Sequence, residues 1–131
     1  MPPERDDLLA QQLQQLRREY LRDSSLRVDE LRQLRARLPR DAGAALADMR
    51  QAFHRLAGSG GSYGFPDVST RSREGERLIM RLESLGAALG PADLAAIDQS
   101  VASVADAFAV AKKAMGTDGQ PGGVDPQTPN A

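Results

Sequence analysis

The sequence predicts an all-α protein, an antiparallel four-helix bundle with an additional N-terminal helix and a disordered C-terminal tail. Leu, Ala and Arg dominate, aromatic residues make up only 4%, and runs of β-branched residues are missing, a composition that favours helices. Apolar residues recur at spacings of three and four, and Pro and Gly separate these stretches. A chain of 131 residues with 40% hydrophobic residues fits one domain, which we place at residues 5–116, with the tail at 117–131.

The first two predicted helices are separated by Asp23-Ser24-Ser25. The first runs from about Asp6 to Arg22. Its apolar stripe consists of Leu9, Leu13, Leu16 and Tyr20. Ser24 or Ser25 can cap the second helix, because a short hydroxyl accepts hydrogen bonds from otherwise unpaired amides. Asp29 and Glu30 suit its first turn, and Pro39 ends it. Its stripe consists of Val28, Leu31, Leu34 and Leu38.

The third predicted helix has Asp41 as its N-cap and runs to about Tyr63. Its buried stripe consists of Leu46, Met49, Phe53 and Leu56, and Tyr63 follows the same spacing at its end. Glycines at 58, 60, 61 and 64 are unusual there, because each interior glycine costs a helix about 1 kcal/mol relative to alanine. Either the helix continues and close approach of a partner or a neighbouring helix compensates, or it ends near Gly58; we favour the continuous helix.

Prolines open the last two predicted helices. Pro66 starts a helix that runs to about Leu85 and is closed by Gly86 or Gly90. Its apolar residues are Val68, Leu78, Ile79, Leu82 and Leu85. Pro91 starts the fifth helix. It carries the most regular apolar repeat of the chain, formed by Leu94, Ile97, Val101, Val104, Phe108, Ala111 and Met115. After Gly116 almost no bulky apolar residue follows, which predicts the disordered tail.

Several classes of function are disfavoured by composition. Without cysteine and with a single histidine, the chain has neither a disulfide framework nor the ligands of a zinc site, so we expect no metal site. A net charge of −1 argues against nucleic-acid binding. We see no signal peptide and no run of transmembrane length, so a cytoplasmic protein without membrane contact is expected. We expect a monomer, with dimerisation through residues 91–115 as the alternative.

The single histidine, His54, is the candidate functional residue. On a helix, its face is shared by the residues three, four and seven positions later, and these are Ala57, Gly58 and Gly61. Such small residues leave the imidazole open to a partner, so we assign them to a partner-docking face. The competing interpretation of a lone histidine between Phe53 and Leu56 is a buried core residue.

The segment Phe53-His54-Arg55-Leu56-Ala57-Gly58-Ser59-Gly60-Gly61-Ser62-Tyr63-Gly64 resembles the His-x-Leu-Lys-Gly-Ser-x-x-x-x-Gly motif of histidine-containing phosphotransfer (HPt) domains. The matching positions are His54, Leu56, Gly58, Ser59 and Gly64. The resemblance covers approximately residues 17–115, leaving out the first helix and the tail, and it implies a four-helix bundle with the phosphoacceptor histidine on a central helix.

The resemblance implies that His54 carries a phosphoryl group between receiver-domain aspartates of a hybrid sensor kinase and a response regulator. The chain would then be a stoichiometric carrier rather than an enzyme. It would need no cofactor of its own, because the partner receiver domain brings the Mg²⁺. The alternative is a helical adaptor or regulatory domain that binds a receiver or kinase without being phosphorylated.

One departure from the motif keeps this alternative open: Ala57 stands where the family usually has a lysine that helps to hold the phosphoryl group. Arg50, four residues before His54, and Arg55 are candidate replacements, and we rank Arg50 higher on helical geometry. Gln51 could orient the ring or bind a phosphoryl oxygen.

Arginines at 71, 73, 77 and 81 alternate with glutamates at 74, 76 and 83 on the fourth predicted helix. We expect a solvated face there, although a receiver's acidic pocket could attract these arginines.

Overall fold

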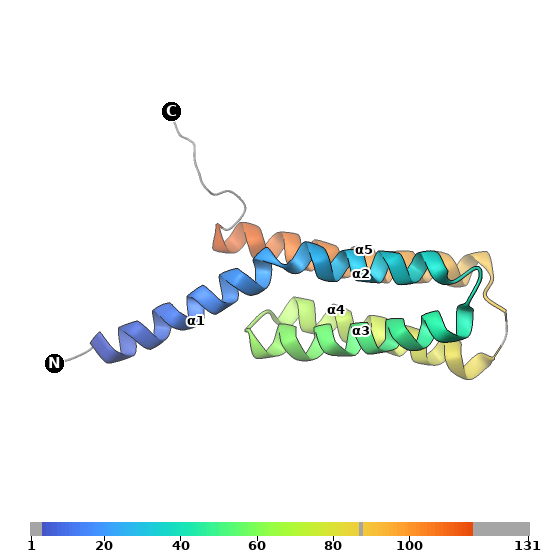
Figure 1. Ribbon diagram of the computed structural model, residues 1–131, viewed down its shortest axis with the longest axis horizontal. Helices are drawn as coiled ribbons and strands as arrows, with labels where there is room; N and C mark the ends of the chain where they lie inside the picture. Colours follow the sequence, from blue (N-terminus) through green and yellow to red (C-terminus); the bar gives the residue numbers. More distant parts are fainter. Residues whose placement is uncertain (1–3, 87, 117–131) are drawn as a thin grey trace, which may run out of the picture.

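The computed structural model describes residues 4–86 and 88–116, and this part of the chain contains helices and no strands. The predicted all-α class is therefore confirmed (Figure 1). The helices are α1 (Glu4–Arg22), α2 (Ser24–Arg37), α3 (Ala42–Ser62), α4 (Pro66–Leu85) and α5 (Pro91–Met115). The predicted disordered tail, residues 117–131, lies outside the described residues.

Helices α2 to α5 form the four-helix bundle. Each packs against its chain neighbours, and α2 also contacts α5, which closes the bundle. In Figure 1, α2 and α5 lie side by side above α3 and α4. The predicted stripes of α2, α3 and α5 supply most of the core. The largest fully buried apolar side chains are Phe53, Phe108, Leu21, Leu31, Met49, Ile79, Ile97, Val68 and Val104.

Helix α1 differs from the prediction in where its apolar stripe lies. Tyr20 is buried, but Leu9, Leu13 and Leu16 are 59%, 52% and 49% exposed. The reason is visible in Figure 1: the N-terminal half of α1 extends away from the bundle, beyond the end where α3 connects to α4. Periodic spacing therefore identified the helix correctly, but no element of the described chain covers the three leucines of its stripe.

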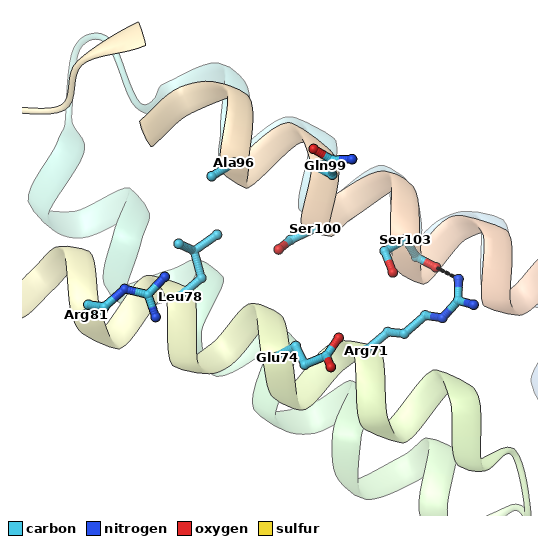
Figure 2. Close-up of a pocket in the computed structure, with 8 residues that line it drawn as sticks. All are labelled: Arg71, Glu74, Leu78, Arg81, Ala96, Gln99, Ser100 and Ser103. Carbon is cyan, nitrogen blue, oxygen red and sulfur yellow. Dashed lines mark hydrogen bonds between the residues drawn. The ribbon is translucent and has the colours of Figure 1, made fainter. Parts of the chain in front are cut away.

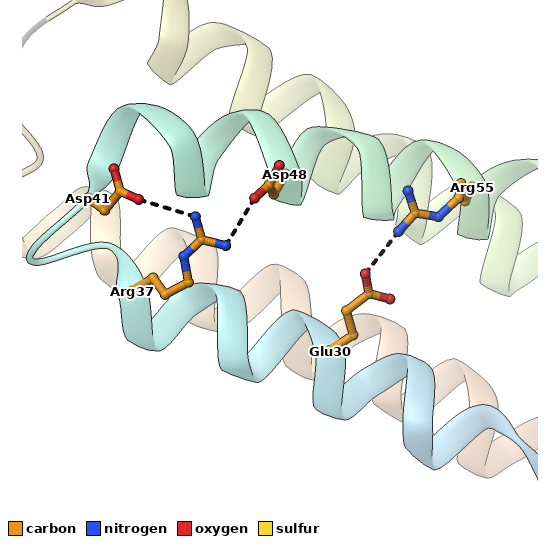
Figure 3. Close-up of polar contacts among 5 residues, drawn as sticks. All are labelled: Glu30, Arg37, Asp41, Asp48 and Arg55. Carbon is orange, nitrogen blue, oxygen red and sulfur yellow. Dashed lines mark hydrogen bonds and ion pairs between the residues drawn. The ribbon is translucent and has the colours of Figure 1, made fainter.

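The predicted N-cap of α2 is wrong, whereas the predicted N-cap position of α3 is confirmed. Only Asp23 separates α1 from α2, and α2 already begins at Ser24, which is buried and makes no capping hydrogen bond. As a result, Asp29 and Glu30 lie beyond the first turn. Asp41 is the N-cap residue of α3 but does not cap with its side chain. Its carboxylate instead accepts a hydrogen bond from Arg37 at 3.2 Å, and Arg37 also binds Asp48 (Figure 3).

Helix α3 continues through its glycines, as we predicted. Gly60 allows close packing against α4, because a Cβ atom there would lie 2.9 Å from Val68 Cγ1 and 3.0 Å from the Ser69 nitrogen. Gly64 follows the helix with φ of 83°, a left-handed conformation that favours glycine. The compensating close approach thus comes from a neighbouring helix at Gly60.

Small residues line part of the contact between α3 and α4, and we call this part the small-residue seam. Its buried members are Ala57, Gly60, Ser69, Ser72 and Gly75. The hydroxyl of Ser69 donates to the carbonyl oxygen of Ala57 at 2.8 Å, which ties the two helices together. At Gly75 the Phe53 ring fills the space that a side chain would need, since a Cβ atom would lie 2.5 Å from Phe53 Cε1.

Gly75→Ala is expected to destabilise the protein by about 1–3 kcal/mol, because the added methyl group clashes with the fully buried Phe53 ring. Urea unfolding followed by circular dichroism at 222 nm measures the effect. Gly43→Ala is the control, because nothing lies within 4 Å of its Cβ position and alanine favours the helix. A Gly75→Ala midpoint at or above that of the wild type would contradict the packing argument.

Helices α4 and α5 follow the predicted boundaries at Pro66, Leu85 and Pro91. Leu85, however, is 67% exposed and does not extend the core. Gly86 ends α4 with φ of 65°, and Gly90 is the N-cap of α5, where its amide donates to the Asp93 carboxylate at 2.9 Å.

Polar groups line a groove between α4 and α5. There Arg71 donates to the Ser103 carbonyl oxygen at 3.0 Å, and Arg81 lines the same groove (Figure 2). Within the predicted arginine face, Arg71 therefore connects two helices, whereas Arg81 is exposed. By length and composition alone, α5 is apolar enough to cross a membrane, which we did not expect from the sequence. A single helix of this kind is weak evidence, because the core helix of a soluble protein passes the same test, and Ile97, Val104 and Phe108 of α5 are buried.

Candidate functional site

The imidazole of His54 lies on the outside of the bundle, at the middle of α3. Its side chain is 74% exposed, whereas the preceding Phe53 is completely buried. The core face and the imidazole face of α3 are therefore distinct, as the helical spacing predicts. The interpretation of His54 as a buried core residue is wrong.

Glu76 of α4 holds the imidazole from one side. Its Oε2 atom lies 3.0 Å from His54 Nδ1, and its side chain is only 20% exposed. An ionised carboxylate can only accept hydrogen bonds, so this contact favours the tautomer with the proton on Nδ1. The other ring nitrogen, Nε2, then keeps its lone pair, and a partner can approach it.

Glu76 was missed in the sequence because it belongs to the alternating charges of α4, which predicted a solvated face. Its role depends on which turns of α3 and α4 face each other. The spacing of residues within one helix does not reveal this register. The only sequence signal was the run of small residues on both helices, which allows them to pack closely.

The three candidates for binding the phosphoryl group, Arg50, Gln51 and Arg55, line one open groove together with His54 and Glu76. Arg50 Nε donates to Glu83 Oε1 at 2.8 Å, and the two side chains are 36% and 29% exposed. Arg55 Nη2 donates to Glu30 Oε2 at 2.9 Å (Figure 3). Both arginines thus already contact a carboxylate, whereas Gln51 is exposed in the groove.

The predicted docking face is open at two of its three positions. Gly58 and Gly61 are exposed, and nothing lies within 4 Å of the Cβ position of Gly58. Ala57 is only 5% exposed, because it belongs to the small-residue seam with α4. The inclusion of Ala57 in the docking face is therefore corrected: it packs inward and offers little surface to a partner.

The last turn of α3 is fixed by α1. Tyr20 shares a hydrogen bond of 2.7 Å with Ser59, and its ring stacks on that of Tyr63 with 4.6 Å between centroids. Burial raises the pKa of the Tyr20 phenol, and the hydrogen bond with Ser59 opposes that rise. Arg17 donates to the Tyr63 carbonyl oxygen at 2.9 Å. These contacts tie the glycine-containing end of α3 to α1.

Residues 4–86 and 88–116 contain no group of three or more His, Cys, Asp or Glu side chains that could hold a metal ion. Glu76 and His54 alone do not complete such a set. The prediction that Mg²⁺ comes with the partner stays a prediction.

Comparison with protein families identifies one match: the family described as Hpt domain matches residues 9–107. The match begins within α1, so most of this helix belongs to the family's domain, contrary to our expectation that the resemblance starts near residue 17. Among curated proteins and solved structures, no match was found.

Proposed function

Because this chain belongs to the Hpt domain family, we propose that His54 carries a phosphoryl group between receiver-domain aspartates of a hybrid sensor kinase and a response regulator. Members of this family are phosphocarrier modules of phosphorelays. The observation that supports the assignment to His54 is its geometry: an exposed imidazole with Nδ1 held by Glu76.

The proposed transfer needs only a lone pair on the carrier. His54 Nε2 attacks the phosphorus of the aspartyl phosphate, the N–P bond forms as the P–O bond to the aspartate breaks, and the aspartate leaves as a carboxylate. The proton on Nδ1 stays in its hydrogen bond to Glu76, whose charge offsets the positive charge that develops on the ring. The same steps in reverse would pass the group to the next receiver, whose Mg²⁺ would stabilise the charge on the phosphoryl group during transfer.

We propose that the receiver docks over Gly58 and Gly61, where α3 offers backbone surface beside His54. The exposed leucines of the α1 stripe, Leu9, Leu13 and Leu16, extend this surface with apolar side chains. Tyr20 connects the glycine face of α3 with the apolar stripe of α1, because it belongs to that stripe and shares a hydrogen bond with Ser59. Proteins of this family are typically soluble, and a cytoplasmic monomer is part of the same proposal.

The function is tested by mixing the full-length chain with ATP, Mg²⁺ and candidate hybrid kinases of the same genome. Phosphoryl label should move to the chain and back to a receiver domain, and the label on the chain should be labile to acid, as expected of a phosphohistidine. If neither a kinase nor phosphoramidate labels the folded chain, the phosphorylation-independent adaptor is favoured instead.

Glu76→Ala is expected to slow phosphoryl transfer about tenfold, because a hydrogen bond to a charged group contributes on the order of 1.5 kcal/mol. Glu76→Gln is the matched variant, since its amide oxygen can still accept a hydrogen bond from Nδ1. Transfer rates and the ¹⁵N chemical shifts of the His54 ring are measured together. Unchanged proportions of the two tautomers in Glu76→Ala would refute a positioning role for this carboxylate.

A further inference from the structure

Arg73 of α4 lies opposite Ala57 of α3. The two helices are antiparallel neighbours, and the contact of His54 with Glu76 fixes their register. Counted from this contact, Ala57 lies one turn further along α3 than His54, and Arg73 lies one turn back along α4 from Glu76. The hydrogen bond from Ser69 to the Ala57 carbonyl oxygen lies next to this pair and agrees with the register.

The contacts of Arg73 differ from those of the two arginines favoured by the sequence. Its Nη2 atom donates to the Ser69 hydroxyl at 3.4 Å, a long and therefore weak hydrogen bond. Within the described residues, its guanidinium forms no ion pair with a carboxylate, whereas Arg50 pairs with Glu83 and Arg55 with Glu30. Arg73 thus keeps an exposed cation that can bind an anion without first giving up a carboxylate partner.

The position of Arg73 also suits the direction of approach. Ser69, which holds it, lies beside Gly61, whose Cβ position is 3.5 Å from the Ser69 hydroxyl oxygen. Arg73 therefore stands at the rim of the open face formed by Gly58 and Gly61, one helical turn from the Glu76 carboxylate. Because Glu76 contacts Nδ1 and the ring is exposed, Nε2 and a phosphoryl group on it are open to a flexible side chain such as that of Arg73.

We propose that Arg73 holds the phosphoryl group on His54, so that α4 supplies the cation that α3 lacks at Ala57. This inference rests on the proposed function of His54 as the phosphoacceptor. A guanidinium offers two parallel N–H donors to phosphoryl oxygens, which is a stronger arrangement than a single contact. Binding requires only that the side chain turn from the Ser69 hydroxyl toward the group.

The test compares Arg73→Gln, Arg73→Lys and the control Arg81→Gln, which removes an arginine from the α4–α5 groove of the same helix (Figure 2). Two quantities are measured: the equilibrium constant for transfer from a phosphorylated receiver domain, and the pKa of the phosphoryl group on the full-length chain by ³¹P NMR. Arg73→Gln should lower the equilibrium constant about tenfold and raise that pKa. Lysine should restore part of both, and Arg81→Gln should change neither.

The outcomes separate this inference from the function on which it rests. A wild-type chain that accepts no label would overturn both. A wild-type chain that is labelled on His54, with Arg73→Gln matching it in the equilibrium constant and in the phosphoryl pKa, would overturn the role of Arg73 alone. The ¹⁵N shifts of unphosphorylated His54 should be the same in Arg73→Gln as in the wild type, and a change would show that Arg73 acts by positioning the ring instead.

Discussion

His54→Gln is expected to reduce phosphoryl transfer to background while leaving the fold intact. The amide nitrogen of glutamine has no available lone pair, so no N–P bond can form. The side chain is 74% exposed, and its removal leaves no cavity in the core. The measurement is acid-labile label on the chain after incubation with a phosphorylated receiver domain, together with thermal unfolding of the variant.

This variant also distinguishes the carrier from the adaptor. An adaptor binds its partner without phosphorylation, so His54→Gln would retain its function. Label that persists in the variant would show that another residue accepts the phosphoryl group. Glutamine keeps an N–H donor for Glu76, and the polar contact between α3 and α4 is therefore perturbed as little as possible.

Gly58→Glu is expected to lower transfer by about a hundredfold or more with little loss of stability. Nothing lies within 4 Å of the Cβ position, and replacing an interior helical glycine contributes up to about 1 kcal/mol to the helix. The new carboxylate, however, occupies the open face one turn from His54. It repels both the phosphoryl group and the acidic pocket of a receiver, and like charges at a contact cost several kcal/mol.

The matched control is Gly43→Glu, which places the same side chain on the first turn of α3, where nothing lies within 4 Å. It should leave transfer unchanged. Gly58→Ala separates bulk from charge and should retain most of the transfer. If Gly58→Glu transfers at the wild-type rate while its circular dichroism is normal, the receiver does not dock over this face.

The helices and their core faces could be predicted because local spacing and proline positions determine them. Val28, Leu31 and Leu34 are buried as expected, and Pro66 and Pro91 begin their helices. The leucines of α1 follow the same spacing but are exposed, because periodicity does not say whether another element covers a face. Asp41 is the N-cap residue of α3 as predicted, but its carboxylate accepts a hydrogen bond from Arg37 instead of from a helix amide.

The surroundings of His54 could be predicted only along its own helix. Gly58 and Gly61 follow from helical spacing, and so does the position of Arg50. The contact of Glu76 with His54 and the position of Arg73 relative to Ala57 depend on which turns of α3 and α4 face each other, and this is set by close packing at Gly60 and Gly75. Ala57, which stands where the motif usually has a lysine, is buried and takes part in that packing.

The small-residue seam has a thermodynamic consequence for signalling. His54 and Glu76 lie on different helices, so the geometry of the acceptor nitrogen exists only while α3 and α4 are paired. Coupling between two equilibria is reciprocal: if pairing favours phosphorylation, phosphorylation must change the free energy of pairing by the same amount. The loaded and unloaded carriers should then differ in the hydrogen exchange of the amides along α3 and α4. A receiver would thus bind either the phosphorylated or the unphosphorylated carrier, and the binding surfaces of the two would differ in rigidity as well as in charge.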